Sequence, residues 1–201
     1  MAHLEPLSIE EFMTLTGGPD GPPRPPGAPR NSERTMARRP ELFRAFGGLA
    51  RAAFAGGTLP PELKNFVAII ASQAAGCRYC QAHRVNTAVD QGIEAERIAA
   101  LWTFEDSDLF DSGEKAALRY AQAAAVVPNA VTADHFAALR DHFDDGEIVE
   151  LTGVIATMGF LNRWNDSLAT ELEDQPLSAA RDVIPSGAWG AGKHSVVRAE
   201  P

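Results

Sequence analysis

Two cysteines and one histidine, placed at regular intervals, are the side chains of this sequence best suited to chemistry. Cys77, Cys80 and His83 follow one another at spacings of three residues, and the chain has no other cysteine. Residues three apart on a helix lie on the same face at about 5–6 Å, a separation that a disulfide tolerates. A dithiol that can close and reopen beside a base is typical of a redox site.

A helix that begins at the dithiol is expected to position these side chains. Gly76 interrupts the preceding apolar segment and Gly92 ends the next one, which predicts a helix from about Cys77 to Gln91. The dithiol then lies at a helix N-terminus, where the partial positive charge lowers the pKa of a thiol. The sequence therefore predicts an available thiolate near neutral pH.

Apolar residues recur with the period of a helix over most of the chain, and no segment shows the sustained alternation of a β-strand. The predicted fold class is all-α. Because proline and glycine dominate residues 17–29, we expect an N-terminal arm or linker over 1–39, a helical domain over 40–172 and an irregular tail over 173–201. Within the domain, helices are expected over 40–55, from an N-cap at Thr58 to about 75, over 77–91 and 93–102, from a capping box at Asp111 and Glu114, from Thr132, and from a cap at Asp145 to about 171.

Composition limits the classes of partner. The 201-residue chain is 45% hydrophobic, which is enough for a core, and it carries a formal charge of -9. Nucleic-acid binding requires clustered lysine and arginine, so this charge argues against such a partner. Basic residues concentrate between Arg24 and Arg51, but Glu33 and Glu41 interrupt them, which favours a solvated surface.

The sequence shows no targeting or membrane-spanning signal. Its first residues contain neither a positively charged nor an apolar targeting region, and the longest uncharged apolar stretch, 151–161, is too short to span a bilayer. We therefore expect a cytoplasmic protein with no membrane partner. In that compartment, paired cysteines are more often catalytic or metal-binding than structural.

Three segments together resemble a known family. They are residues 59–64, the run Ala75-Gly76-Cys77-Arg78-Tyr79-Cys80-Gln81-Ala82-His83 and residues 160–168, with Gly92 one helix after the dithiol. This order is similar to the carboxymuconolactone decarboxylase/alkylhydroperoxidase D (AhpD-like) superfamily, on its peroxidase-related side, over residues 40–172. The resemblance implies an AhpD-like helical bundle whose core is completed by several subunits, as a homo-oligomer of trimer or hexamer size.

The resemblance also implies a reaction. Cys80 would attack a hydroperoxide as the peroxidatic cysteine, Cys77 would resolve the sulfenic acid as a disulfide, and His83 would relay protons. Such a reaction uses no metal and no organic cofactor. It requires an external dithiol, such as a thioredoxin-like or lipoyl protein, to reduce the disulfide again.

The sequence departs from the family pattern at two positions. Better-known members place the histidine four residues after the second cysteine, where this chain has Arg84. Their relay glutamate usually lies twelve residues before the first cysteine, where this chain has Asn65, a side chain that cannot act as a base. Glu62, one helical turn earlier, is the candidate to reach the same space.

Three other functions fit parts of the same pattern. A lactone decarboxylase with the same fold would use histidine and acidic groups without cysteine redox. A zinc site would use the two thiols and His83, but it needs a fourth ligand, from His135 or His142. A redox-sensing or disulfide-exchange module would cycle the thiols with a partner protein and consume no peroxide.

Overall fold

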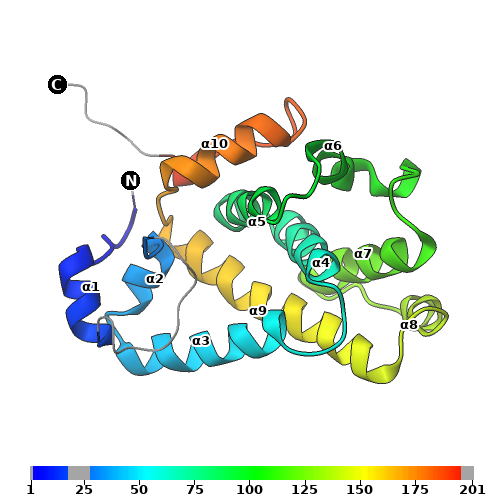
Figure 1. Ribbon diagram of the computed structural model, residues 1–201, viewed down its shortest axis with the longest axis horizontal. Helices are drawn as coiled ribbons and strands as arrows, with labels where there is room; N and C mark the ends of the chain where they lie inside the picture. The colour runs from blue at the N-terminus through cyan, green and yellow to red at the C-terminus, as the bar shows by residue number, and fades with distance from the viewer. Residues whose placement is uncertain (1, 18–27, 196–201) are drawn as a thin grey trace.

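The computed structural model describes residues 2–17 and 28–195, and every regular element within these ranges is helical (Figure 1). The all-α class predicted from the sequence is therefore confirmed. No helix in the described ranges has both the length and the apolar character needed to cross a membrane. In chain order the elements are α1 (Ile9–Thr16), α2 (Asn31–Met36), α3 (Pro40–Ala55), α4 (Pro61–Ala74), α5 (Arg78–Asp90), α6 (Ala95–Ala99), the 3₁₀ segment η2 (Ala100–Asp106), α7 (Ser112–Ala125), α8 (Ala133–Arg140), α9 (Asp145–Leu168), α10 (Asp174–Val183) and the 3₁₀ turn η3 (Gly192–His194).

Helix α4 lies in the middle of the main hydrophobic core, where it packs against α5, α7 and α9 (Figure 1). Every residue from Leu63 to Ser72 is buried, as expected for a helix that is apolar on more than one side. The chain then turns into α5 through Gly76, whose φ of +76° favours glycine. Helix α4 is therefore a fixed support against which α5 presents the dithiol.

The start of α4 differs from the sequence prediction. Thr58 was expected to cap the helix, but the N-cap is Pro60 and the first helical residue is Pro61. The Thr58 backbone N–H instead donates to the Glu150 carboxylate of α9, at 2.7 Å. Because this acceptor comes from a distant helix, the local sequence could not indicate that it would hold Thr58 outside the helix.

The long helix α9 also begins and ends slightly differently from the prediction. Its N-cap is Asp144 and not Asp145, since the Asp144 side chain accepts the Glu147 N–H at 2.8 Å. The Glu147 side chain accepts the Asp144 N–H at 3.0 Å in return, which completes a capping box that Asp145 cannot form with this glutamate. The helix ends at Leu168, before the predicted end at about residue 171, and Ala169 adopts a left-handed conformation with φ of 48°.

The N-terminal part of the chain forms a second hydrophobic cluster at one end of the molecule (Figure 1). Phe12 of α1 meets Phe43 of α3 edge-on, with ring centroids 5.4 Å apart, and Leu7 and Met36 are buried beside them. The arm or linker expected over residues 1–39 therefore contains packed helices on both sides of its Pro- and Gly-rich run. Most of that run, residues 18–27, lies outside the described residues.

The expected irregular tail after residue 172 contains the helix α10, so that expectation was wrong for this segment. Pro176 lies in its first turn, where the missing N–H does no harm, and Pro176 and Ala180 are buried. Helix α10 packs against α5 (Figure 1). The chain returns through η3, where the His194 carbonyl oxygen accepts the Leu172 N–H at 2.9 Å.

Candidate functional site

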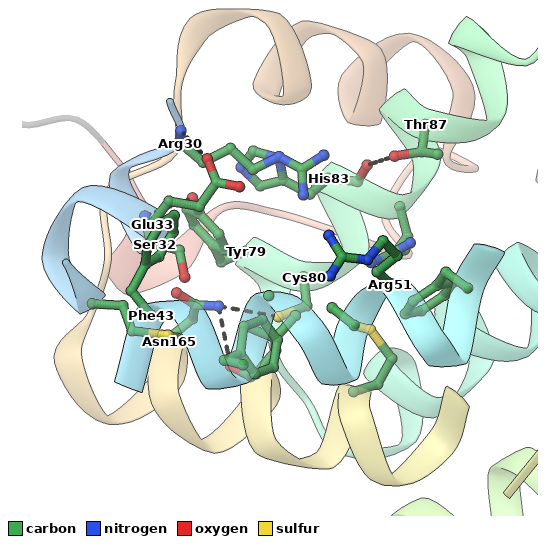
Figure 2. Close-up of a pocket in the computed structure, with 18 of the residues that line it drawn as sticks. Arg30, Ser32, Glu33, Phe43, Arg51, Tyr79, Cys80, His83, Thr87 and Asn165 are labelled. Carbon is green, nitrogen blue, oxygen red and sulfur yellow. Dashed lines mark hydrogen bonds between the residues drawn. The ribbon is translucent and has the colours of Figure 1, made fainter. Parts of the chain in front are cut away.

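One face of α5 forms a wall of a cavity of about 520 Å³ (Figure 2). The helix spans Arg78–Asp90 with Cys77 as its N-cap, which confirms the predicted helix at the dithiol. Cys80, His83, Arg84 and Thr87 recur at helical spacing on this wall. The opposite walls are mostly apolar and come from other helices; they include Met36, Phe43, Phe46, Phe54, Met158 and Leu161.

The two cysteines are free thiols in different surroundings. Cys80 is only 3% exposed but lines the cavity, whereas Cys77 is 0% exposed and does not contribute to the cavity wall. The Cys77 sulfur accepts the Cys80 backbone N–H at 3.4 Å, at the first turn of α5. A small molecule in the cavity therefore meets Cys80 first, and Cys77 lies behind it.

The two thiols have opposite tendencies to ionise. A hydrogen bond from the Cys80 thiol, together with the backbone N–H groups of the helix start, holds the pKa of Cys77 below its ordinary value despite burial. Burial first, and then the hydrogen bond and charge of Cys77, raise the pKa of Cys80 well above its ordinary value. The acidic thiol predicted at the helix N-terminus is thus Cys77, and Cys80 holds its proton at neutral pH.

A residue of α9 that sequence reasoning missed contacts the Cys80 sulfur. Asn165 Nδ2 donates to Cys80 Sγ at 3.5 Å and to the Leu161 carbonyl oxygen at 3.1 Å. The first of these bonds favours the charged form of Cys80 and opposes part of the effect of burial. The sequence signal was the resemblance of residues 160–168 to a core helix, but that signal did not single out Asn165.

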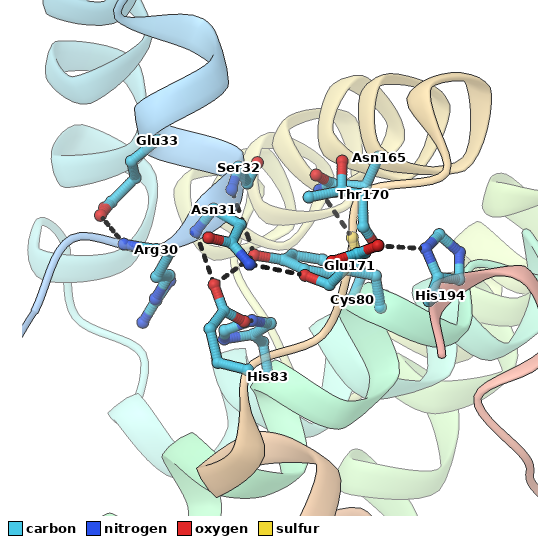
Figure 3. Close-up of polar contacts among 12 residues, drawn as sticks. Arg30, Asn31, Ser32, Glu33, Cys80, His83, Asn165, Thr170, Glu171 and His194 are labelled. Atoms are coloured by element: carbon cyan, nitrogen blue, oxygen red, sulfur yellow. Dashed lines mark hydrogen bonds and ion pairs between the residues drawn. The ribbon is translucent and has the colours of Figure 1, made fainter. Parts of the chain in front are cut away.

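His83 is bound to a second missed residue, Glu173. The His83 Nε2 and Glu173 Oε2 atoms are 2.7 Å apart. The other carboxylate oxygen accepts the Asn31 backbone N–H at 2.5 Å and the Tyr79 hydroxyl at 3.1 Å. Figure 3 shows Asn31 of α2 and His83 of α5 close together. Glu173 is the N-cap residue of α10, and the turn signal of Pro176 three residues later could have indicated that a helix starts here.

In the His83–Glu173 pair the imidazole is neutral and the carboxylate is charged near neutral pH. Burial lowers the pKa of His83 by more than the neighbouring carboxylate raises it. Burial acts against the charge of Glu173, but the hydrogen bond and charge of His83 and the Asn31 N–H outweigh it and hold the pKa of Glu173 below its ordinary value. With Nε2–H donated to Glu173, Nδ1 of His83 is the nitrogen that can accept a proton.

The structure does not bring Glu62 to the dithiol. Its carboxylate lies 3.3 Å from Nε of Arg97, is 40% exposed and does not line the cavity. Asn65 is buried and donates to the Arg84 carbonyl oxygen at 3.0 Å, so it joins α4 to α5. The carboxylate that contacts His83 is therefore that of Glu173, from the C-terminal part of the chain, and not that of Glu62.

The zinc ligand set considered from the sequence is not assembled. Across residues 2–17 and 28–195, no three His, Cys, Asp or Glu side chains are grouped as a metal would require. His135 lies on α8, and its Nδ1 accepts the Thr132 N–H at 3.1 Å as part of the helix start. His83 lines the same cavity as Cys80, and its Nε2 already has the Glu173 carboxylate as its partner.

Part of the chain that includes the dithiol helix matches a known protein family. Residues 40–123 match the family model described as carboxymuconolactone decarboxylase family. An uncharacterized protein of Mycobacterium tuberculosis is 33% identical over 107 residues, which is 53% of this chain and only 38% of that protein's length. The chain therefore matches less than half of this relative.

Two proteins of known structure share the fold and part of the sequence. The debrominase Bmp8 superposes with a TM-score of 0.77 at 29% identity, covering 89% of this chain and 96% of Bmp8. A cysteine-to-alanine variant of Bmp8 has been solved in complex with 2,3,4-tribromopyrrole. A protein of unknown function from Agrobacterium tumefaciens, a candidate antioxidant defence protein AhpD, has a TM-score of 0.64 at 25% identity, over 68% of this chain and 93% of that protein.

The match to the family model begins at the first residue of α3 and includes the dithiol helix. The structural likeness extends the agreement to nearly all of the chain. Residues 40–123 therefore match the carboxymuconolactone decarboxylase family, and the chain shares its fold with an AhpD-like protein.

Proposed function

We propose that the protein is a thiol-dependent hydroperoxidase with peroxiredoxin-type activity, in which Cys77 and Cys80 supply two electrons. The observation that carries the proposal is the order of groups at the cavity wall. Cys80 lines the cavity, Cys77 lies directly behind it, and His83 stands on the same face of α5. A hydroperoxide in the cavity would meet one thiol, with a second thiol and a proton carrier close by.

In the first step the Cys80 sulfur attacks the terminal oxygen of the hydroperoxide. A sulfur–oxygen bond forms and the oxygen–oxygen bond breaks, so Cys80 is oxidised to a sulfenic acid and the peroxide is reduced to an alcohol. Burial keeps Cys80 protonated, so its proton has to leave as the sulfur attacks. The neutral imidazole of His83 is suited to accept that proton and pass it to the departing alkoxide.

In the second step the Cys77 sulfur attacks the sulfenic sulfur of Cys80. The disulfide forms, and the hydroxyl group leaves with one proton as water. The lowered pKa of Cys77 suits this role, because the thiolate is the attacking species. An external dithiol of the thioredoxin-like or lipoyl type then returns both thiols to the reduced state, and the cycle needs no metal or organic cofactor.

Reductive dehalogenation is a second candidate, favoured by the likeness to Bmp8 over 96% of that chain. The electron count is the same: an aryl bromide and two thiols give the arene, a disulfide and hydrogen bromide. The apolar cavity beside Cys80 can accept a halogenated ring as well as an alkyl peroxide. The decarboxylase alternative leaves the dithiol unused, and the alternative of a disulfide-exchange or redox-sensing module leaves the cavity unused.

Turnover assays with two variants test the proposal. With cumene hydroperoxide and dithiothreitol, the wild type is expected to turn over and Cys80→Ser to be inactive. With the peroxide alone and no dithiothreitol, Cys77→Ser should be oxidised once per chain and stop at the sulfenic acid, whereas the wild type should form the Cys77–Cys80 disulfide. Full turnover by both variants contradicts the dithiol mechanism. Bromide release from a brominated pyrrole without peroxide consumption selects the second candidate.

Cycling of the thiols with a thioredoxin-like partner, without any substrate turnover, selects the redox-sensing alternative. We also propose that the protein is a cytoplasmic trimer or hexamer. Gel filtration with light scattering tests the oligomeric state. A mass of about 65 or 129 kDa is expected from the 21.5 kDa chain, as three times 21.5 and six times 21.5.

A further inference from the structure

The cavity wall has an excess of positive charge. Arg30, Arg44, Arg51 and Arg84 line it, against the single carboxylate of Glu33. Part of that carboxylate is already used, because Glu33 Oε2 accepts the Arg30 backbone N–H at 2.9 Å. Within residues 2–17 and 28–195, none of the four guanidinium groups forms an ion pair with an acidic side chain.

The basic run interpreted from the sequence as a solvated surface also contributes to the cavity. Arg44 and Arg51 are exposed, as the sequence suggested, but with Arg30 they also face the cavity. The whole chain has a formal charge of -9, so a local concentration of unpaired arginines at one cavity has the opposite sign to the net charge. Such an arrangement attracts anions to the cavity.

Arg84 is the most informative of the four arginines. It is partly buried, and its guanidinium carbon lies 4.0 Å from the centre of the Phe54 ring. Burial first, and then repulsion from Arg30, lower the pKa of Arg84 to about 9. Burying a cation without an acidic partner and near a second cation is costly, and an anion between the two would relieve both effects.

The remaining walls suit an apolar ring. Phe43, Phe46, Phe54 and Met158 come from α3 and α9 and face the α5 stripe. A cavity of about 150 Å³ is enough for benzene, so about 520 Å³ accommodates one or two fused rings with substituents. The cavity therefore combines an apolar wall with positively charged arginine side chains.

We infer that the cavity binds a small, flat organic anion whose acidic group pairs with Arg84 and whose ring lies against the phenylalanine wall. Cys80 and Arg84 are four residues apart on α5, about one helical turn. The acidic group and the atom presented to Cys80 are therefore about one ring apart in the ligand. This geometry selects compact aromatic carboxylates and similar monoanions over long-chain fatty acids with a distant carboxylate. The binding of such an anion does not depend on the proposed function. Only a reaction of the bound ligand at Cys80 rests on it.

A matched pair of ligands tests the inference without any turnover. Isothermal titration calorimetry on the reduced protein would compare 2-naphthoate with 2-naphthamide, which has nearly the same shape and no charge. The wild type is expected to bind naphthoate about tenfold or more tightly, because a hydrogen-bonded charge pair with Arg84 is lost in the amide. Arg84→Gln should abolish the preference, and Arg84→Lys should retain part of it.

The control variant is Arg140→Gln, since Arg140 also lies over a phenylalanine ring, at 5.7 Å from the Phe136 centroid, but outside the cavity. It should leave the preference for naphthoate unchanged. If Arg84→Gln fails to fold, Arg30→Gln should weaken the preference in the same direction. Equal binding of both ligands to the wild type overturns the inference even if peroxide is turned over. A preference that survives in an inactive protein upholds it and rejects only the proposed function.

Discussion

At the scale of single side chains, two opposing effects set the pKa of His83. Burial disfavours the imidazolium, and the Glu173 carboxylate at 2.7 Å favours it. Burial prevails, so the imidazole is neutral near neutral pH and can act as the base for Cys80. Glu173 therefore fixes which nitrogen is protonated and limits how far the pKa falls.

Glu173→Gln is expected to shift the acidic side of the pH–rate profile for Cys80 oxidation to lower pH. The carboxylate raises the pKa of His83, so its removal lowers that pKa further and the neutral imidazole persists to more acidic solutions. The plateau rate should also fall, because the amide no longer fixes the imidazole. The measurement is single-turnover oxidation by cumene hydroperoxide from pH 5 to pH 8, with these limits chosen to span roughly the ordinary histidine pKa.

Two further variants make this result specific. Glu173→Asp should restore part of the rate, since it keeps the charge. Glu171→Gln removes the same charge two residues away, where the residue contributes its backbone carbonyl to Asn31, and it should behave as the wild type. An acid limb that stays in place in Glu173→Gln would show that His83 is not the titrating base.

At the scale of elements, the sequence could predict the dithiol helix because its signals are local. Gly76 and Gly92 delimit α5 and Cys77 caps it, all within one short stretch of chain. The partner of His83 could not be predicted, because Glu173 is 90 positions away. It reaches the site only because α9 ends at Leu168 and α10 folds back onto α5. Glu62 was the candidate because it lies close to the expected position along the sequence. The sequence could not indicate that the Glu62 carboxylate would instead pair with Arg97.

The loop between α3 and α4 is held by one long-range ion pair. Lys64 is 2% exposed, and its ammonium lies 2.9 Å from Glu150 Oε2 of α9 and also donates to the Gly56 carbonyl oxygen. Burial acts against the Glu150 charge, but Lys64 and the Thr58 N–H outweigh it and lower the pKa of Glu150 to about 2. This clamp fixes the end of α3 that carries Phe54 at the cavity.

Glu150→Gln is expected to lower the free energy of unfolding by about 2–4 kcal/mol at pH 7, because Lys64 remains buried without a counter-charge. The carboxyl pKa is lowered from 4.5, so its stabilisation is complete above that pH and is lost as the pH falls toward 2. The difference between wild type and variant should therefore shrink over that window. Urea unfolding at several pH values measures it.

An exposed ion pair provides the comparison. Glu105 and Arg119 are each 46% exposed, so Glu105→Gln should cost less than about 1 kcal/mol at any pH. If Glu150→Gln is as mild as Glu105→Gln, the clamp does not hold the loop.

At the scale of the whole molecule, two hydrophobic clusters meet around the cavity. The main core contains α4 and α5, and the smaller cluster joins α1 and α2 to α3. Met36 and Phe43 belong to the smaller cluster and also line the cavity. The N-terminal segment is therefore part of the site, which the predicted arm or linker did not anticipate.

Phe12→Ala is expected to loosen the smaller cluster and leave the main core intact. Phe12 is 0% exposed, and removing a buried ring costs about 3–5 kcal/mol. Hydrogen exchange in α1 and α2 should therefore accelerate by about two orders of magnitude or more, up to the exchange limit of these helices. Amides of α4 should keep their protection.

Ile9→Ala is the matched control in the same helix, because Ile9 is 54% exposed and contributes little packing. It should change exchange only slightly. Equal acceleration in α4 after Phe12→Ala would show that the two clusters unfold as one unit.

The proposed mechanism requires Cys77 and Cys80 to form a redox pair that a substrate in the cavity oxidises. The most direct measurement is stopped-flow oxidation of the reduced protein by one equivalent of cumene hydroperoxide, followed by mass spectrometry of the peptide that contains both cysteines. We expect rapid, stoichiometric loss of two hydrogens from that peptide, reversed by a dithiol. Two free thiols after exposure to the peroxide would contradict it.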